Sequence, residues 1–180
     1  MGKHLDYITP ELQEFIADQK IFFVGTAMQE GHINVSPKGL DSLRVINKNE
    51  VVWLNLTGSG NETAAYLLHD NRMTIMFCAF EGKPLILRLY GSASIYHERD
   101  VEFKEYIDLF PKNIGSRQII KMRVELVQTS CGFGVPLLDF KAEREVLNRF
   151  AKNKGDAGIK KYWKDKNMVS LDGHETGIFE

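Results

Sequence analysis

Cysteine is scarce in this chain of 180 residues, with Cys78 and Cys131 as the two examples. They lie far apart and form no C-x-x-C pair, which argues against a disulfide framework and against a zinc site. Cys78 lies within an apolar run, so we expect it to be buried and inert. The five histidines show no metal-ligand spacing, and the sequence predicts no metal site.

An excess of one charge and long apolar runs are missing too. Lys and Arg number 23 against 24 Asp and Glu, and this balance argues against non-specific nucleic-acid binding. No apolar run approaches membrane-spanning length, and the opening residues M-G-K-H-L-D-Y hold no hydrophobic signal region. We therefore expect no nucleic-acid partner, no membrane partner and a cytoplasmic location. Walker, G-x-S-x-G and G-x-G-x-x-G fingerprints are also absent.

Short runs of apolar, aromatic and β-branched residues alternate with turn residues along most of the chain. Six strands are expected, at residues 21–27, 33–38, 50–56, 72–79, 85–96 and 118–128. Most consecutive strands lack a crossover helix, which argues against a parallel Rossmann sheet. The pattern predicts a mainly β protein, a six-stranded antiparallel β-barrel with peripheral helices.

Helix signals occur at the start of the chain and in its tail. Thr9 is a candidate cap and Pro10 suits the first helical position. The tail changes character after Thr129, with a glycine-rich loop and helices expected near residues 141–152 and 157–164. We expect a barrel domain over residues 1–130 and a C-terminal helical extension over residues 131–180, packed on the same domain.

A loop of small residues precedes the short helix expected near residue 62. The segment T-G-S-G-N-E-T contains Ser59 and Glu62 at the S-x-x-E spacing of a capping box. The first N–H groups of a helix lack partners and carry partial positive charge, so small residues there let a phosphate approach. Ser59, Asn61 and Thr63 are therefore candidate phosphate ligands. The alternative is that Ser59 and Glu62 only cap the helix.

Two cations flank a turn earlier in the chain. Lys38 and Arg44 lie either side of G-L-D-S, and a phosphate accepts a point charge from Lys and forked hydrogen bonds from Arg. The alternative is a solvated hairpin end in which Asp41 pairs with Arg44, a pair that contributes about 1 kcal/mol or less if exposed. The sequence leaves both interpretations open.

An apolar strand with one amide connects these two segments. Trp53, Leu54 and Asn55 occur within V-V-W-L-N-L, and an Asn in such a strand is costly unless its amide finds a partner. The amide of Asn55 is expected to bond either the edge of a ring or a neighbouring loop. Together, the three segments indicate a phosphorylated aromatic cofactor.

The order of these motifs is similar to that of a known family. V-S-P-K-G-L-D-S-L-R-V, V-W-L-N-L-T-G-S-G-N-E-T-A-A-Y-L, N-R-M-T-I-M-F-C-A-F and L-R-L-Y-G-S-A together resemble the pyridoxamine 5'-phosphate oxidase-like family of FMN-binding split β-barrels. The resemblance covers residues 15–95 well, and T-S-C-G-F-G-V-P in the tail resembles a bacterial subgroup of pyridoxamine oxidase-related FMN-binding proteins. It implies a homodimer with FMN in clefts at the subunit interface.

The resemblance also implies which residues hold the flavin. In the family, a strand ending in Lys and the start of the next helix hold the phosphate, and the strand between them runs along the isoalloxazine. With the cation from the turn added, the candidate cofactor-binding residues are Val35, Ser36, Pro37, Lys38, Arg44, Leu54, Asn55, Ser59, Asn61 and Thr63.

One departure from the family bears on function. True pyridoxamine phosphate oxidases carry a basic Ser-Arg-Lys triplet at the helix start, where this chain has Asn61-Glu62-Thr63. Ile33 stands near the place of the arginine that opens their phosphate-binding strand. Phosphate binding must then rely on Lys38, Arg44 and hydroxyl or backbone donors, and the sequence argues against oxidation of pyridoxamine phosphate.

We therefore expect an FMN-dependent oxidoreductase that acts with a small-molecule substrate or electron donor. The residues identify no acid–base group, and two alternatives stay open. One is a non-catalytic flavin-binding or sensing protein, and the other is the same barrel with haem or deazaflavin bound.

Overall fold

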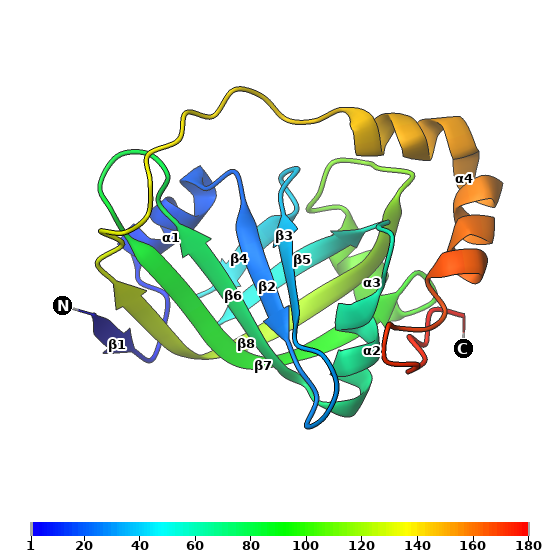
Figure 1. Ribbon diagram of the computed structural model, residues 1–180, viewed down its shortest axis with the longest axis horizontal. Coiled ribbons are helices and arrows are strands. Elements are labelled where there is room, and N and C mark those ends of the chain that lie inside the picture. The colour runs from blue at the N-terminus through cyan, green and yellow to red at the C-terminus, as the bar shows by residue number, and fades with distance from the viewer. Residues whose placement is uncertain (1, 180) are drawn as a thin grey trace.

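One antiparallel sheet forms the body of the protein (Figure 1). The computed structural model describes residues 2–179, and this part of the chain contains eight strands in a single sheet. The strands are β1 (Lys3–Leu5), β2 (Phe22–Thr26), β3 (Asn34–Lys38), β4 (Leu43–Asn47), β5 (Glu50–Leu56), β6 (Arg72–Cys78), β7 (Ile86–His97) and β8 (Ser116–Ser130). Their order is β3-β2-β6-β7-β8-β5-β4, with β1 paired to β8, and every pair is antiparallel.

The mainly β, antiparallel fold predicted from the sequence is confirmed, but the sheet has two strands more than the expected six. The sequence pattern misses β1 because three residues are too few to show an alternation. It misses β4 because L-R-V-I-N reads as the end of a hairpin, whereas β4 turns back antiparallel onto β5 with Leu43 opposite Trp53. In the part of the chain that is described, β3 and β4 end the sheet and leave it open.

Four helices lie at the periphery of residues 2–179 (Figure 1). They are α1 (Pro10–Asp18), α2 (Glu62–His69), α3 (Val101–Ile107) and α4 (Val146–Lys166). The predicted cap of α1 is confirmed, because the Thr9 side chain accepts a hydrogen bond from the Leu12 N–H. The two helices expected in the tail are the halves of α4, which begins at Val146 and changes direction at Gly155, where φ is 62°.

The capping box predicted for α2 is wrong. The cap position is Asn61, not Ser59, and the Asn61 side chain makes no capping hydrogen bond. The Glu62 carboxylate instead accepts a hydrogen bond from the backbone N–H of Leu171 at 2.8 Å. A contact from far along the chain therefore uses the acid that a local capping box would need.

The apolar core lies mainly inside the curved sheet. Trp53, Phe77 and Ile75 are among its fully buried side chains, and Trp53 meets Phe22 edge to face with ring centroids 6.2 Å apart. A second cluster lies on the other face of β5 and β8, where α3 supplies Phe103. Strand alternation explains the division, because successive side chains of β5 point to opposite faces.

The C-terminal segment packs onto the barrel near the start of α2. Trp163 donates from its indole Nε1 to the Thr57 hydroxyl at 2.9 Å, and Asp172 accepts from the Tyr66 hydroxyl at 2.6 Å. Asp172 also contacts the ring of His32 in the turn between β2 and β3. The tail therefore joins α2 to the β2–β3 hairpin. No helix within residues 2–179 combines the length and apolar character that a membrane span requires.

Candidate functional site

Strand β3 divides its four predicted ligands between two faces. Val35 and Pro37 are exposed, whereas Ser36 and Lys38 point inward with Asn34. The Asn34 amide donates to the hydroxyls of Thr26 at 3.0 Å and Thr63 at 3.1 Å, and so ties β3 to β2 and to the first turn of α2. The inward face of β3 and the start of α2 therefore adjoin each other.

Lys38 is a partly buried cation that makes no ion pair within residues 2–179. Its Nζ lies 4.9 Å from the ring centroid of Trp53 on β5, in cation–π geometry. Burial and the charge of Arg117 together lower the pKa of Lys38 to about 8. At neutral pH the side chain is still charged, and an anion nearby would stabilise that charge.

Arg117 on β8 is a functional candidate that nothing in the local sequence marks. It lies just before the strand expected at residues 118–128, yet it is only 3% exposed in the fold. Its NH1 donates to the carbonyl of Gly60 at 2.9 Å and to the side-chain oxygen of Asn167 at 2.8 Å. The signal that identifies Arg117 is a buried guanidinium whose neighbours are neutral.

The start of α2 offers donors without a side-chain cap. Asn61 and Thr63 are buried, and the Asn61 amide donates to the Asn167 carbonyl at the long distance of 3.5 Å. Because no side chain caps the helix, its first N–H groups remain available to a ligand. Ser59 is exposed at the entrance of this turn.

Asn55 belongs to a buried polar row across three strands. Its amide nitrogen donates to Gln118 at 3.0 Å, and Gln118 in turn contacts the ring nitrogen Nε2 of His97 at 3.3 Å. Burial lowers the pKa of His97 to about 4, so the imidazole is neutral at physiological pH. The amide partner expected for Asn55 is thus a neighbouring strand, while its Oδ1 has no partner in the described chain.

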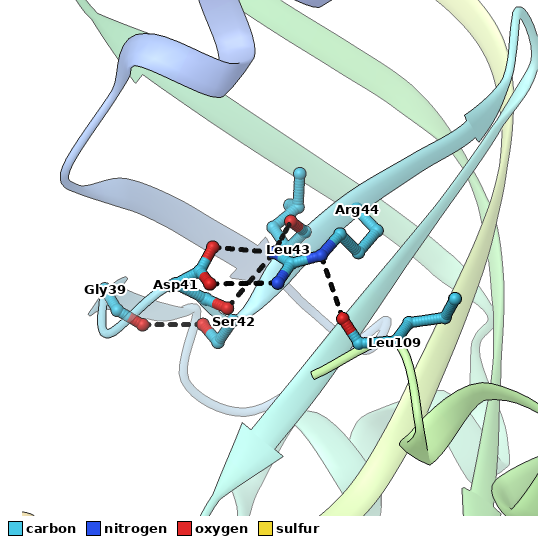
Figure 2. Close-up of polar contacts among 6 residues, drawn as sticks. All are labelled: Gly39, Asp41, Ser42, Leu43, Arg44 and Leu109. Atoms are coloured by element: carbon cyan, nitrogen blue, oxygen red, sulfur yellow. Dashed lines mark hydrogen bonds and ion pairs between the residues drawn. The ribbon is translucent and has the colours of Figure 1, made fainter. Parts of the chain in front are cut away.

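Arg44 has a different environment from the other predicted ligands (Figure 2). Its guanidinium forms a forked pair with the Asp41 carboxylate at 2.7 and 2.9 Å and donates to the Leu109 carbonyl at 3.1 Å. It also lies 4.9 Å from the ring of Phe110. The Asp41–Arg44 pair, which the sequence allowed as the alternative, is present, and it occupies both arms of the fork.

Two cavities flank Leu40, which lies in the turn between β3 and β4. One has a volume of about 390 Å³ and mainly apolar walls, and Ser59 lines it together with Tyr162 of α4. The other has a volume of about 530 Å³, and Leu54 lines it. The structure thus places Leu54 and Ser59 beside open space on either side of one turn.

The donor set fits the phosphate end of a flavin nucleotide. Four buried side-chain atoms in the described chain lack hydrogen-bond partners, namely Ser36 Oγ, Asn55 Oδ1, Asn61 Oδ1 and Arg117 Nε. Buried polar atoms are normally paired, so such a group of orphans indicates an absent partner. The Ser36 hydroxyl and the Arg117 N–H are donors that suit phosphate oxygens.

An open antiparallel barrel with this polar cluster at one end defines a class of protein, and comparisons with known proteins identify the family. A family model described as pyridoxamine 5'-phosphate oxidase matches residues 8–131. The chain is 36% identical to "Pyridoxamine 5'-phosphate oxidase family protein ustO" of Aspergillus flavus, over 92% of this chain and 74% of that protein. The chain therefore belongs to the pyridoxamine 5'-phosphate oxidase family.

Solved structures share the fold at low sequence identity. HupZ from Group A Streptococcus superposes with a TM-score of 0.54 at 20% identity, covering 68% of this chain and 99% of that chain. A Lactobacillus delbrueckii structure named after the same oxidase gives a TM-score of 0.53 at 14% identity, covering 68% and 94%. The likeness shows that the eight-stranded sheet has the split-barrel arrangement of this family.

Proposed function

We propose that the protein binds FMN and acts as an oxidoreductase on a small-molecule substrate or electron donor. The observation that carries the proposal is the pair of cations, Lys38 and Arg117, held without carboxylate partners beside an uncapped helix start. One dianionic phosphate would neutralise both. Family membership supports the choice of a flavin nucleotide as the source of that phosphate.

The residues of the site divide by role. Lys38, Ser36 and the first turn of α2 would bind the phosphate, with Asn61 and Thr63 at the helix start. Leu54 and Asn55 would contact the isoalloxazine, and Ser59 would line the entrance. Val35 and Pro37 face outward, so they would contribute backbone groups only. FMN supplies hydride or electron transfer when it is bound, and this chain binds and orients it.

A homodimer is part of the proposal. Val35 and Ile33 belong to the exposed side of the β3 edge, with exposed fractions of 65% and 75%. An exposed edge strand with apolar side chains favours pairing with another chain. Light scattering at micromolar concentration checks the dimer, and a monomer would contradict it. The cytoplasmic location stays a prediction from the sequence.

The bound cofactor decides between the proposal and its alternatives. Protein purified gently should be yellow, and mass spectrometry of the released compound should give FMN. A haem or deazaflavin spectrum would move the same barrel to another cofactor, and a colourless protein that takes up no added FMN would overturn the proposal. Rapid NAD(P)H-driven reduction and reoxidation would then separate an oxidoreductase from a flavin-binding sensor.

A further inference from the structure

Arg117 is a buried charge that the fold holds in place without neutralising it. The side chain is 3% exposed and makes no ion pair within residues 2–179. A guanidinium stays protonated in proteins, so burial does not discharge it. A buried charge without an opposite charge is costly, and such groups are kept where a ligand or partner compensates them.

The groups around Arg117 fix its position. Its NH1 donates to the Gly60 carbonyl and to Asn167 Oδ1, at 2.9 and 2.8 Å. Asn167 is itself fully buried, donates to the Gly58 carbonyl at 3.2 Å and accepts at its backbone oxygen from the Thr176 hydroxyl at 2.6 Å. The C-terminal segment therefore holds the guanidinium against the loop that leads into α2.

One edge of the guanidinium remains free for a ligand. Arg117 Nε is buried and has no acceptor within the described residues. Lys38 lies close enough for the charge of Arg117 to lower its pKa, so the two cations repel each other in the free protein. The cap residue of α2, Asn61, leaves the first N–H groups of the helix uncapped. Two like charges and a helix start are stabilised together by one anion.

We propose that Arg117 is a ligand of the flavin phosphate and reaches it from β8. This inference rests on the proposed FMN binding and deepens it by naming the cation that compensates for the sequence Asn61-Glu62-Thr63 at the helix start. Asn167 positions Arg117 and thereby makes the tail a part of the phosphate site in the same chain.

FMN and riboflavin differ in the phosphate, so the two ligands isolate its contacts. Dissociation constants for both are measured by flavin fluorescence with the wild type, Arg117→Met and Arg117→Lys. Arg117→Met is expected to bind FMN roughly 10- to 100-fold more weakly, the usual effect of losing a charge-assisted hydrogen bond, and riboflavin within about threefold of wild type. Arg117→Lys keeps the charge and is expected to lose only about 3- to 10-fold for FMN.

Equal losses for FMN and riboflavin, or an unchanged FMN affinity, would overturn the assignment. If Arg117→Met does not fold, as judged by circular dichroism, Arg117→Lys decides: a loss confined to FMN supports the role and no loss removes it. A wild type that binds neither flavin rejects the proposed function instead. In that case inorganic phosphate is the probe, and thermal stabilisation of the wild type beyond that of Arg117→Lys supports the phosphate site, whereas equal or no stabilisation overturns it.

Discussion

Lys38 and Arg44 carry the same charge in neighbouring segments but differ in what surrounds them. Arg44 is partly exposed, and the Asp41 carboxylate takes both arms of its fork (Figure 2). Lys38 lies over the Trp53 ring without a carboxylate, and its pKa is lowered to about 8. The difference teaches that a cation is available to a ligand when the fold leaves its charge uncompensated, whatever motif contains it.

The largest difference between the two cations is expected in FMN affinity. Lys38→Met keeps most of the aliphatic length and removes the charge, so FMN should bind roughly 10- to 100-fold more weakly. Riboflavin should bind within about threefold of wild type, because it has no phosphate for the lysine to contact. Fluorescence titration measures both constants. An FMN affinity within threefold of wild type would place the phosphate away from Lys38.

The pH dependence of FMN binding is expected to follow Lys38. The lysine loses its proton near pH 8 in the free protein, and the phosphate becomes a dianion above about pH 6. FMN affinity should therefore be greatest between these values and fall about tenfold from pH 7 to pH 9, as the neutral lysine ceases to attract the phosphate. The control is Lys38→Met, in which this fall should be absent. A wild-type affinity that stays level to pH 9 would contradict the role of the lysine charge.

The stability of the flavin-free protein should show the cost of the same charge. The pKa of Lys38 is about 8 when folded and about 10.4 when unfolded, so the unfolded chain binds more protons between these values. By linkage, the free energy of unfolding rises as pH increases from about 8 to 10.4, and the cost is fully present below pH 8. Lys38→Met should raise this free energy by about 1 kcal/mol at pH 7, after loss of the cation–π contact.

Thermal unfolding of the flavin-free proteins measures this effect. A gain of about 1 kcal/mol corresponds to an increase in Tm of roughly 2–4 °C for a chain of this size. The gain should shrink as the pH approaches 10, because the wild-type lysine is then neutral in both states. A variant that is less stable than wild type at pH 7 would mean that Lys38 is stabilised in the free protein by its surroundings.

The sequence predicts the parts of the fold that depend on local patterns. Thr9 followed by Pro10 predicts the start of α1, and alternation predicts long strands such as β7, because both signals lie within a few residues. The phosphate-binding candidate Lys38 is found in the same way, from a strand end before a turn. Short strands such as β1 depend on a distant partner, here β8, and leave no such pattern.

The partners that distinguish one candidate from another are mostly distant in sequence. Glu62 has the spacing of a capping residue, but its carboxylate accepts from Leu171, 109 positions away. Arg117 becomes a candidate only when Gly60 and Asn167, 57 and 50 positions away, enclose it. No local motif contains this information, because tertiary contacts decide which polar groups are already paired.

Arg44 is the case in which a local partner was visible in the sequence, and its replacement should have the smallest effect. Arg44→Met should leave FMN and riboflavin affinities within about twofold of wild type, because Asp41 already compensates its charge. The free energy of unfolding should fall by about 1 kcal/mol, from the exposed pair and the bond to Leu109. Urea unfolding and the same titrations measure the two quantities.

Asp41→Asn is the matched control for Arg44. It removes the carboxylate charge, keeps the shape of the side chain and leaves Arg44 without its counter-ion. If the pair is only structural, both variants lose a similar small amount of stability and neither changes FMN binding. If Asp41→Asn tightens FMN binding and Arg44→Met weakens it by tenfold or more, the released guanidinium contacts the phosphate. Arg44 would then join Lys38 as a ligand, and the contrast between the two cations would disappear.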